Sequence, residues 1–101
     1  MKDVKDLDEI LTELKIIMVR KNQDYGPYNI AHAPGSPMNG LLVRMHDKME
    51  RLQNLAYRRS GDTPNYESIE DTLKDLANYA IIGLMVQRGQ WEGVSGASIS
   101  K

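Results

Sequence analysis

Glu67-Ser-Ile-Glu-Asp-Thr-Leu-Lys-Asp-Leu-Ala-Asn-Tyr79 is the stretch that decides the fold of this chain. At about 100° per residue in a helix, four polar residues fall on one stripe, namely Glu67, Asp71, Asp75 and Asn78. The opposite side carries Ile69, Leu73, Leu76 and Ala80. Beyond Asn78 the sequence becomes apolar nearly all round, so we expect the second half of this helix to be buried on two sides. The acidic stripe then either lines a polar or metal site or remains a solvated face, since carboxylate-rich stripes are common on helices.

The composition is that of one folded domain. Hydrophobic residues make up 41% of the 101 residues and charged residues 27%, which is the range of globular proteins. A chain of this length is marginal for a large core, so we expect a homo-oligomer.

The charge and the cysteine count exclude several classes of function. The net charge of -1 argues against direct nucleic-acid binding. The absence of cysteine excludes disulfides, thiolate metal sites and a cysteine nucleophile. With no signal-peptide core and no membrane-length apolar run, we expect a soluble, cytoplasmic protein.

Apolar residues at helical spacing predict three main helices, at residues 4–21, 38–60 and 66–88. Residues 22–39 carry several glycines and prolines without a sustained period and are predicted to form a long loop. The fold class is therefore an all-α, small helical bundle over residues 1–89, completed by oligomerisation. Residues 90–101 are small and polar and are predicted to be a flexible or extended tail, with Trp91 anchoring it to a neighbour.

Three cations border the apolar stripe of the second predicted helix. Arg44, Lys48 and Arg51 are spaced i, i+4 and i+7, so they share one strip of the helix. A charge at a buried edge needs a partner, because leaving it unpaired is costly. The acidic stripe of the third helix would supply that partner in a structural salt-bridge network; alternatively, the cations hold a phosphate or share a metal with that stripe.

The mouth of the predicted loop has a similar mixture of groups. Lys21-Asn-Gln-Asp-Tyr-Gly26 combines a cation, amides, a carboxylate and an aromatic ring, which can hold a sugar or stack on a base. The alternative is a plain helix end stopped by Gly26, with Tyr25 packing on the core.

Carboxylates on two predicted helices suggest a metal centre. Asp47 on the second helix and Glu67 and Asp71 on the third could converge on one or two Mg²⁺ or Mn²⁺ ions, with Glu50 and Asp75 nearby. Scarce histidine and absent cysteine argue against zinc. The sequence has no P-loop, no Rossmann glycine pattern and no Ser/His/Asp set, so side chains and metal would have to hold any phosphate.

Three blocks of the sequence, residues 21–26, 42–55 and 67–80, resemble in order those of the nucleotide modification associated domain 1 family, which is widespread in bacteriophages. The resemblance covers roughly residues 7–86. That family is more distantly similar to the all-α nucleoside triphosphate pyrophosphohydrolases of the MazG and dimeric dUTPase type. The resemblance implies a MazG-like bundle that forms dimers or tetramers, in the host cell cytoplasm if the chain is phage-encoded.

The activity implied by the resemblance is Mg²⁺-dependent (or Mn²⁺-dependent) hydrolysis of a (deoxy)nucleoside triphosphate between its α- and β-phosphates, in phage nucleotide metabolism. The pyrophosphohydrolases carry E-x-x-E on one helix and E-x-x-D on the next. This chain has Asp47-x-x-Glu50 and Glu67-x-x-x-Asp71, the second one residue longer. Asp47, Glu67 and Asp71 would hold metal, and Glu50 and Asp75 would be further ligands or the water-activating base.

The pyrophosphohydrolase hypothesis also assigns roles to residues that would bind the nucleotide. Phosphates would be bound by Lys21, Arg44, Lys48 and Arg51, and the rest of the nucleotide would be contacted by Asn22, Asp24, Tyr25 and Asn78. Two other classes of function remain open. One is a non-catalytic module that sequesters a nucleotide or cyclic nucleotide, as a phage anti-defence protein would. The other is purely structural, with acids and cations paired across helices and the oligomer contacting other proteins.

Overall fold

The computed structural model describes residues 3–58 and 66–95, with side chains described from residue 68 onward in the second range. Within these residues the chain is all-α, as predicted. Its elements are α1 (Lys5–Tyr25), α2 (Tyr28–Ala31), α3 (Pro37–Gln53), the π-helical segment η1 (Asn54–Arg58) and α4 (Tyr66–Gln87). None of the described helices combines the length and apolar character that crossing a membrane requires.

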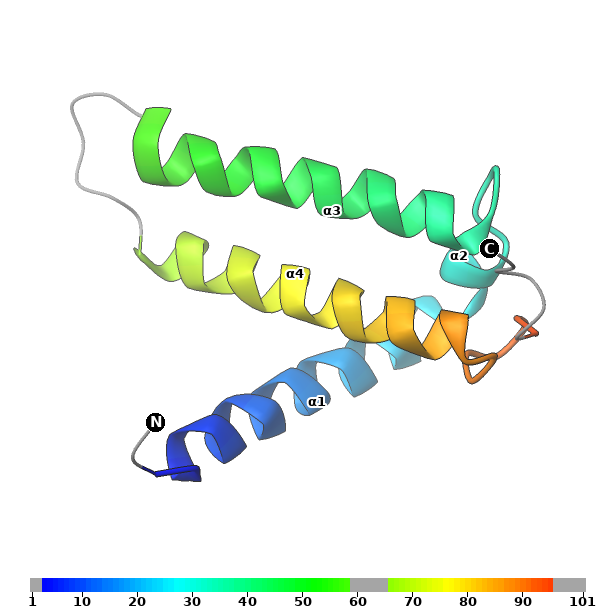
Figure 1. The fold of residues 1–101 in the computed structure, drawn as a ribbon, viewed down its shortest axis with the longest axis horizontal. Helices are drawn as coiled ribbons and strands as arrows, with labels where there is room; N and C mark the ends of the chain where they lie inside the picture. The colour runs from blue at the N-terminus through cyan, green and yellow to red at the C-terminus, as the bar shows by residue number, and fades with distance from the viewer. Residues whose placement is uncertain (1–2, 59–65, 96–101) are drawn as a thin grey trace.

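α3 and α4 lie side by side and antiparallel, and α1 crosses beside α4 (Figure 1). The N-terminal end of α1 diverges from α4, whereas its C-terminal half packs against it (Figure 1). Near the middle of α1, Asn78 Nδ2 donates a hydrogen bond of 3.1 Å to the carbonyl oxygen of Leu14. Lys74 Nζ also lies 3.2 Å from Glu13 Oε1. The crossing of α1 over α4 is therefore fixed by polar contacts along the stripe that was predicted to be acidic.

The predicted long loop 22–39 is wrong in three places, where the structure is helical. α1 continues to Tyr25 and ends at Gly26, whose φ of 70° favours glycine and whose N–H bonds the Asn22 carbonyl at 2.8 Å. α2 then forms within the segment, and α3 begins with Pro37 after Ser36, whose hydroxyl accepts the Asn39 N–H at 2.9 Å. Short polar sequences such as residues 22–25 have no apolar period, so periodicity alone stops the helix early.

The buried core lies at one end of the helical hairpin, where α2 and the chain after α4 pack between α3 and α4. Its buried residues are Ile30, Leu41, Ile82, Val86, Trp91 and Val94. The predicted tail is therefore wrong for residues 90–95, because Trp91 and Val94 pack into their own chain rather than reaching a neighbour. Residues 96–101 lie outside the described chain, as do residues 59–65, where the second helix was predicted to end.

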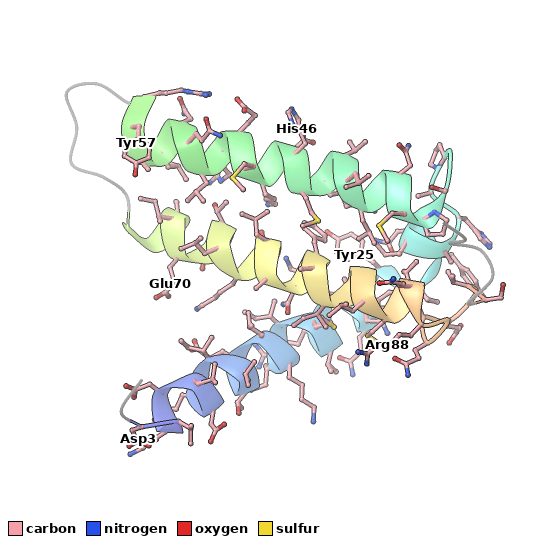
Figure 2. The ribbon with its side chains drawn as sticks, viewed as in Figure 1. Asp3, Tyr25, His46, Tyr57, Glu70 and Arg88 are labelled. Atoms are coloured by element: carbon pink, nitrogen blue, oxygen red, sulfur yellow. The ribbon has the colours of Figure 1, made fainter. Side chains whose placement is uncertain are left out.

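α4 is covered on one side. Ile82 and Val86 are buried, but Ala80 and Leu84 on another face are exposed. The prediction of burial on two sides is therefore wrong for the single chain, because α1 and α3 together cover only part of the helix. Figure 2 shows side chains that extend from both α1 and α4 into open space.

Candidate functional site

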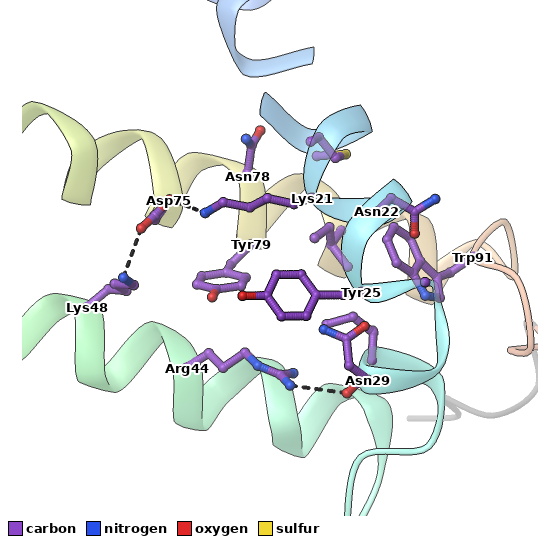
Figure 3. A pocket seen from close by; sticks show the side chains of 14 residues that line it. Lys21, Asn22, Tyr25, Asn29, Arg44, Lys48, Asp75, Asn78, Tyr79 and Trp91 are labelled. Carbon is purple, nitrogen blue, oxygen red and sulfur yellow. Dashed lines mark hydrogen bonds and ion pairs between the residues drawn. The ribbon is translucent and has the colours of Figure 1, made fainter. Parts of the chain in front are cut away.

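A pocket opens where the C-terminal half of α1, α2, α3 and the middle of α4 meet (Figure 3). Its volume is about 430 Å³, within the range of about 300–1,000 Å³ typical of small-molecule sites. The polar lining residues are Lys21, Asn22, Asn29, Arg44, Lys48, Asp75 and Asn78. The remaining lining residues are Met18, Tyr25, Gly26, Ile30, Tyr79, Ile82 and Trp91.

One wall of the pocket is formed by a carboxylate held between two lysines, here called the Lys21–Asp75–Lys48 bridge. Lys21 Nζ lies 2.9 Å from Asp75 Oδ1, and Lys48 Nζ lies 2.9 Å from Asp75 Oδ2. The three side chains come from α1, α4 and α3, so the bridge joins all three long helices (Figure 3). The prediction that a cation at the border of the α3 stripe pairs with the α4 acids is confirmed for Lys48.

The charges in this bridge stabilise one another. Partial burial acts to raise the pKa of Asp75, but the hydrogen bonds and charges of Lys48 and Lys21 outweigh it and hold the pKa below the usual 3.8. For Lys21, burial acts to lower the pKa, whereas the hydrogen bond and charge of Asp75 raise it above the usual 10.5. Both groups are therefore charged at neutral pH.

Arg44 and Asn78 each carry a polar atom that the fold leaves unused. Arg44 Nη2 donates to the Asn29 carbonyl at 3.2 Å, and Asn78 Nδ2 donates to that of Leu14. Among the described residues, the buried atoms Arg44 Nη1 and Asn78 Oδ1 have no hydrogen-bond partner. Buried donors and acceptors are rarely left in this state, because each unmade hydrogen bond costs about 1–3 kcal/mol. Both residues line the pocket, but these two atoms are themselves buried, and Arg44 Nη1 lies beside Gly40 of its own helix.

Aromatic rings form much of the remaining surface. Tyr25 extends from the last turn of α1 and is 71% exposed, while Tyr79 is partly buried one turn after Asp75 on α4. In Figure 3 both rings lie between the Lys21–Asp75–Lys48 bridge and Arg44. Trp91 closes another part of the wall, and its Nε1 donates to the Pro27 carbonyl at 2.9 Å. A side lined by charged groups and a side lined by aromatic rings therefore share one pocket.

The structure brings together most of the residues that were predicted to bind a nucleotide. Lys21, Asn22, Tyr25, Arg44, Lys48 and Asn78 all line the pocket, as does Asp75. Asp24 and Arg51 do not, and both are exposed. On α1, positions 21, 22 and 25 share a face that Asp24 does not.

Two of the three carboxylates predicted to hold metal lie outside the pocket. Asp47 and Asp71 are exposed and do not line the pocket, and the side chain of Glu67 lies outside the described part of the chain. Among the described side chains, no three histidine or acidic groups gather as a metal site would require. Asp75 already has a lysine on each oxygen. The side chains present therefore do not fit a metal centre in the pocket, and the set of Asp47, Glu67 and Asp71 stays a prediction.

Glu50, predicted as a catalytic group, forms a surface ion pair. Its Oε1 lies 2.8 Å from Arg58 Nη1 on η1. The hydrogen bond and charge of Arg58 hold the pKa of Glu50 below the usual 4.5. A general base works best with a pKa near the operating pH, so this pairing moves Glu50 away from that role.

Of the described polar and aromatic residues that line the pocket, three were not predicted from the sequence. Tyr79 follows Asp75 by four positions, and that helical spacing would have identified it. Asn29 and Trp91 carry no such signal, since their places depend on α2 and on the packing of residues 90–95.

Comparison with known proteins adds one match. The model of the family described as nucleotide modification associated domain 1 matches residues 21–86, which is more than half of the chain. The chain belongs to this family. No curated protein and no solved structure matches it. The matched range of the nucleotide modification associated domain 1 begins at Lys21 and contains every pocket residue except Met18 and Trp91.

Proposed function

We propose that this nucleotide modification associated domain binds a phosphorylated nucleotide in the pocket between α1, α3 and α4. The observation that carries the proposal is the Lys21–Asp75–Lys48 bridge inside a pocket that also holds tyrosines and amides. Two ammonium groups from different helices already bind the oxygens of one anion there, each at 2.9 Å. Lysine binds phosphate through the same point charge, and arginine adds planar donors.

The rest of the nucleotide has suitable surfaces within reach. Tyr25 and Tyr79 offer ring faces for a base, and stacking of a base on an aromatic side chain contributes about 1–3 kcal/mol. Asn22 and Asn29 offer amides for the polar edges of the base or the sugar. The family description, which refers to nucleotide modification, supports the same class of ligand.

A thermal-shift screen of nucleotides tests the proposal. A ligand at a hundred times its Kd adds about 2.7 kcal/mol to the free energy of unfolding, so at least one phosphorylated nucleotide is expected to raise Tm. Lys21→Met is expected to abolish the shift. Lys5→Met, which removes the same charge from an exposed position at the start of α1, is the matched control and is expected to retain it. A screen without any shift would contradict the proposal.

Hydrolysis of a nucleoside triphosphate by this domain is the second candidate. It is favoured by Asp47 and Asp71, which are exposed on α3 and α4, two helices that pack against each other. If it is correct, a nucleotide that raises Tm only with Mg²⁺ will be converted to its monophosphate and pyrophosphate, and Asp71→Asn will abolish the conversion. If every nucleotide that raises Tm is recovered intact after incubation with Mg²⁺, hydrolysis is excluded and the function is binding without turnover.

A further inference from the structure

Asp75 occupies the position in the pocket where an anion is best bound. Each of its oxygens accepts one lysine at 2.9 Å, and its side chain is 17% exposed. Among the described residues that line the pocket it is the only carboxylate, and the cations there are Lys21, Lys48 and Arg44. Its carboxylate thus fills a place that a ligand of the same charge could fill instead.

A phosphate group has the chemistry to replace that carboxylate. A phosphate monoester has three strong acceptor oxygens and about 1.5 to 2 negative charges at neutral pH. Two of its oxygens could take the lysines, as those of Asp75 now do. The third would remain for another donor, and Arg44 is the third cation of the described lining.

The charge balance of the pocket favours a single phosphate. With three cations and one carboxylate on its walls, the pocket has two positive charges in excess. One phosphate monoester neutralises that excess without a metal ion. A triphosphate carries further charge on two more phosphates, and the described side chains offer neither additional cations in the pocket nor a metal centre to balance it.

The aromatic and amide lining indicates the rest of the ligand. Tyr25 and Tyr79 line the pocket together with Asn22 and Asn29. Ring faces stack on a nucleobase, and amides pair with its polar edges or with sugar hydroxyls. Inorganic phosphate has no base to stack on these rings.

We propose that the pocket selects a nucleoside monophosphate without metal, and that its phosphate displaces the carboxylate of Asp75 from between Lys21 and Lys48. This proposal rests on the proposed function. Asp75 is then an internal competitor that sets the affinity of the pocket, rather than a metal ligand or a base. Because the ligand must break two existing ion pairs, removing the carboxylate strengthens binding.

Calorimetry in EDTA, with the common ribo- and deoxyribonucleoside 5′-monophosphates, their triphosphates and the free nucleosides, tests the inference. At least one monophosphate is expected to bind at least about tenfold more tightly than its triphosphate and its nucleoside. Asp75→Asn is expected to bind that monophosphate about tenfold more tightly than the wild type, which corresponds to about 1.4 kcal/mol. Glu92→Gln removes one negative charge from an exposed residue that does not line the pocket, and its affinity is expected to be unchanged.

A second measurement uses the wild-type protein and does not depend on the folding of a variant. In ¹³C-aspartate-labelled protein, the carboxyl resonance of Asp75 is expected to titrate at a higher pH with the monophosphate bound than without it, because the ligand takes its lysine partners. Weaker binding by Asp75→Asn, an unchanged Asp75 titration, or tighter binding of a triphosphate with Mg²⁺ would overturn this inference alone. Absence of binding by every phosphorylated nucleotide, with and without Mg²⁺, would overturn the proposed function as well.

Discussion

At the scale of single residues, the carboxylate of Asp75 makes the stability of the fold depend on pH. Burial opposes its ionisation, but Lys48 and Lys21 overcome that effect and its folded-state pKa lies below 3.8. The stabilisation is therefore fully present above the unfolded-state pKa and is lost as pH falls through the folded-state value. Its loss removes the ion pairs that connect α4 to both α1 and α3.

We predict that Asp75→Asn is less stable than the wild type by about 1–2 kcal/mol at about pH 7, because two charge-assisted hydrogen bonds weaken. The difference is expected to shrink at about pH 3, where the wild-type carboxylate approaches protonation. Urea unfolding of both proteins at the two pH values measures it. A difference that stays constant over this range would show that ionisation of Asp75 does not stabilise the fold.

Tyr25 allows a test of ligand binding without a large change in stability, because its ring is 71% exposed. Tyr25→Ala is expected to weaken nucleotide binding by about 1–3 kcal/mol, the contribution of one stacked base, and to change the free energy of unfolding by less than about 0.5 kcal/mol. Tyr57→Ala on η1, where the ring is 87% exposed and outside the pocket, is the control. Equal affinities of the two variants would exclude stacking on Tyr25.

At the scale of elements, the end of α1 decides which residues enter the site. The period of the apolar residues predicted an end near residue 21, but the helix continues to Tyr25 and stops at Gly26. This extra turn directs Lys21 and Tyr25 into the pocket and Asp24 away from it. Amphipathic spacing therefore predicted the three long helices and the Lys48 pairing. It could not predict α2 or the packing of Trp91, which depend on contacts distant in the sequence.

The segment after α4 gives a second prediction at this scale. Trp91 is buried in the core and bonds the Pro27 carbonyl, so it fixes the turn between α1 and α2 beside the pocket. Trp91→Ala is expected to lower the free energy of unfolding by about 3–5 kcal/mol. Trp91→Phe, which keeps a large ring and loses the hydrogen bond, is expected to lose about 1 kcal/mol. Chemical denaturation measures both, and a loss below about 1 kcal/mol for Trp91→Ala would contradict this role.

At the scale of the whole molecule, the core and the exposed apolar surface lie at different places. The buried residues gather where α2 and residues 90–95 meet α3 and α4, whereas the first half of α1 diverges from α4 (Figure 1). That half exposes Leu7, Ile10 and Leu11, although they continue the stripe that buries Leu14. An amphipathic helix such as this half of α1 is stabilised mainly by packing of its apolar face. The described residues of one chain do not provide that packing.

We propose that a second copy of the chain covers this surface, because α1 is complementary to itself. Beside the apolar stripe, its first half carries Asp6 and Asp8, and its second half carries Lys15. Two α1 helices that pack antiparallel about a two-fold axis therefore place acids of one copy beside cations of the other and bring the two apolar stripes together. Light scattering after size exclusion is expected to give at least twice the 11.4 kDa of one chain.

Substitution of the apolar stripe tests which surface forms this contact. Leu11 is 48% exposed on α1, so Leu11→Gln removes apolar area from the proposed interface while the buried core stays intact. It is expected to shift the mass toward that of one chain, because burial of apolar area drives association. Leu42→Gln on α3, at a similarly exposed leucine away from α1, is expected to leave the mass unchanged. A wild-type protein with the mass of a single chain at every concentration would contradict the pairing of α1, and dissociation by Leu42→Gln alone would move the interface to α3.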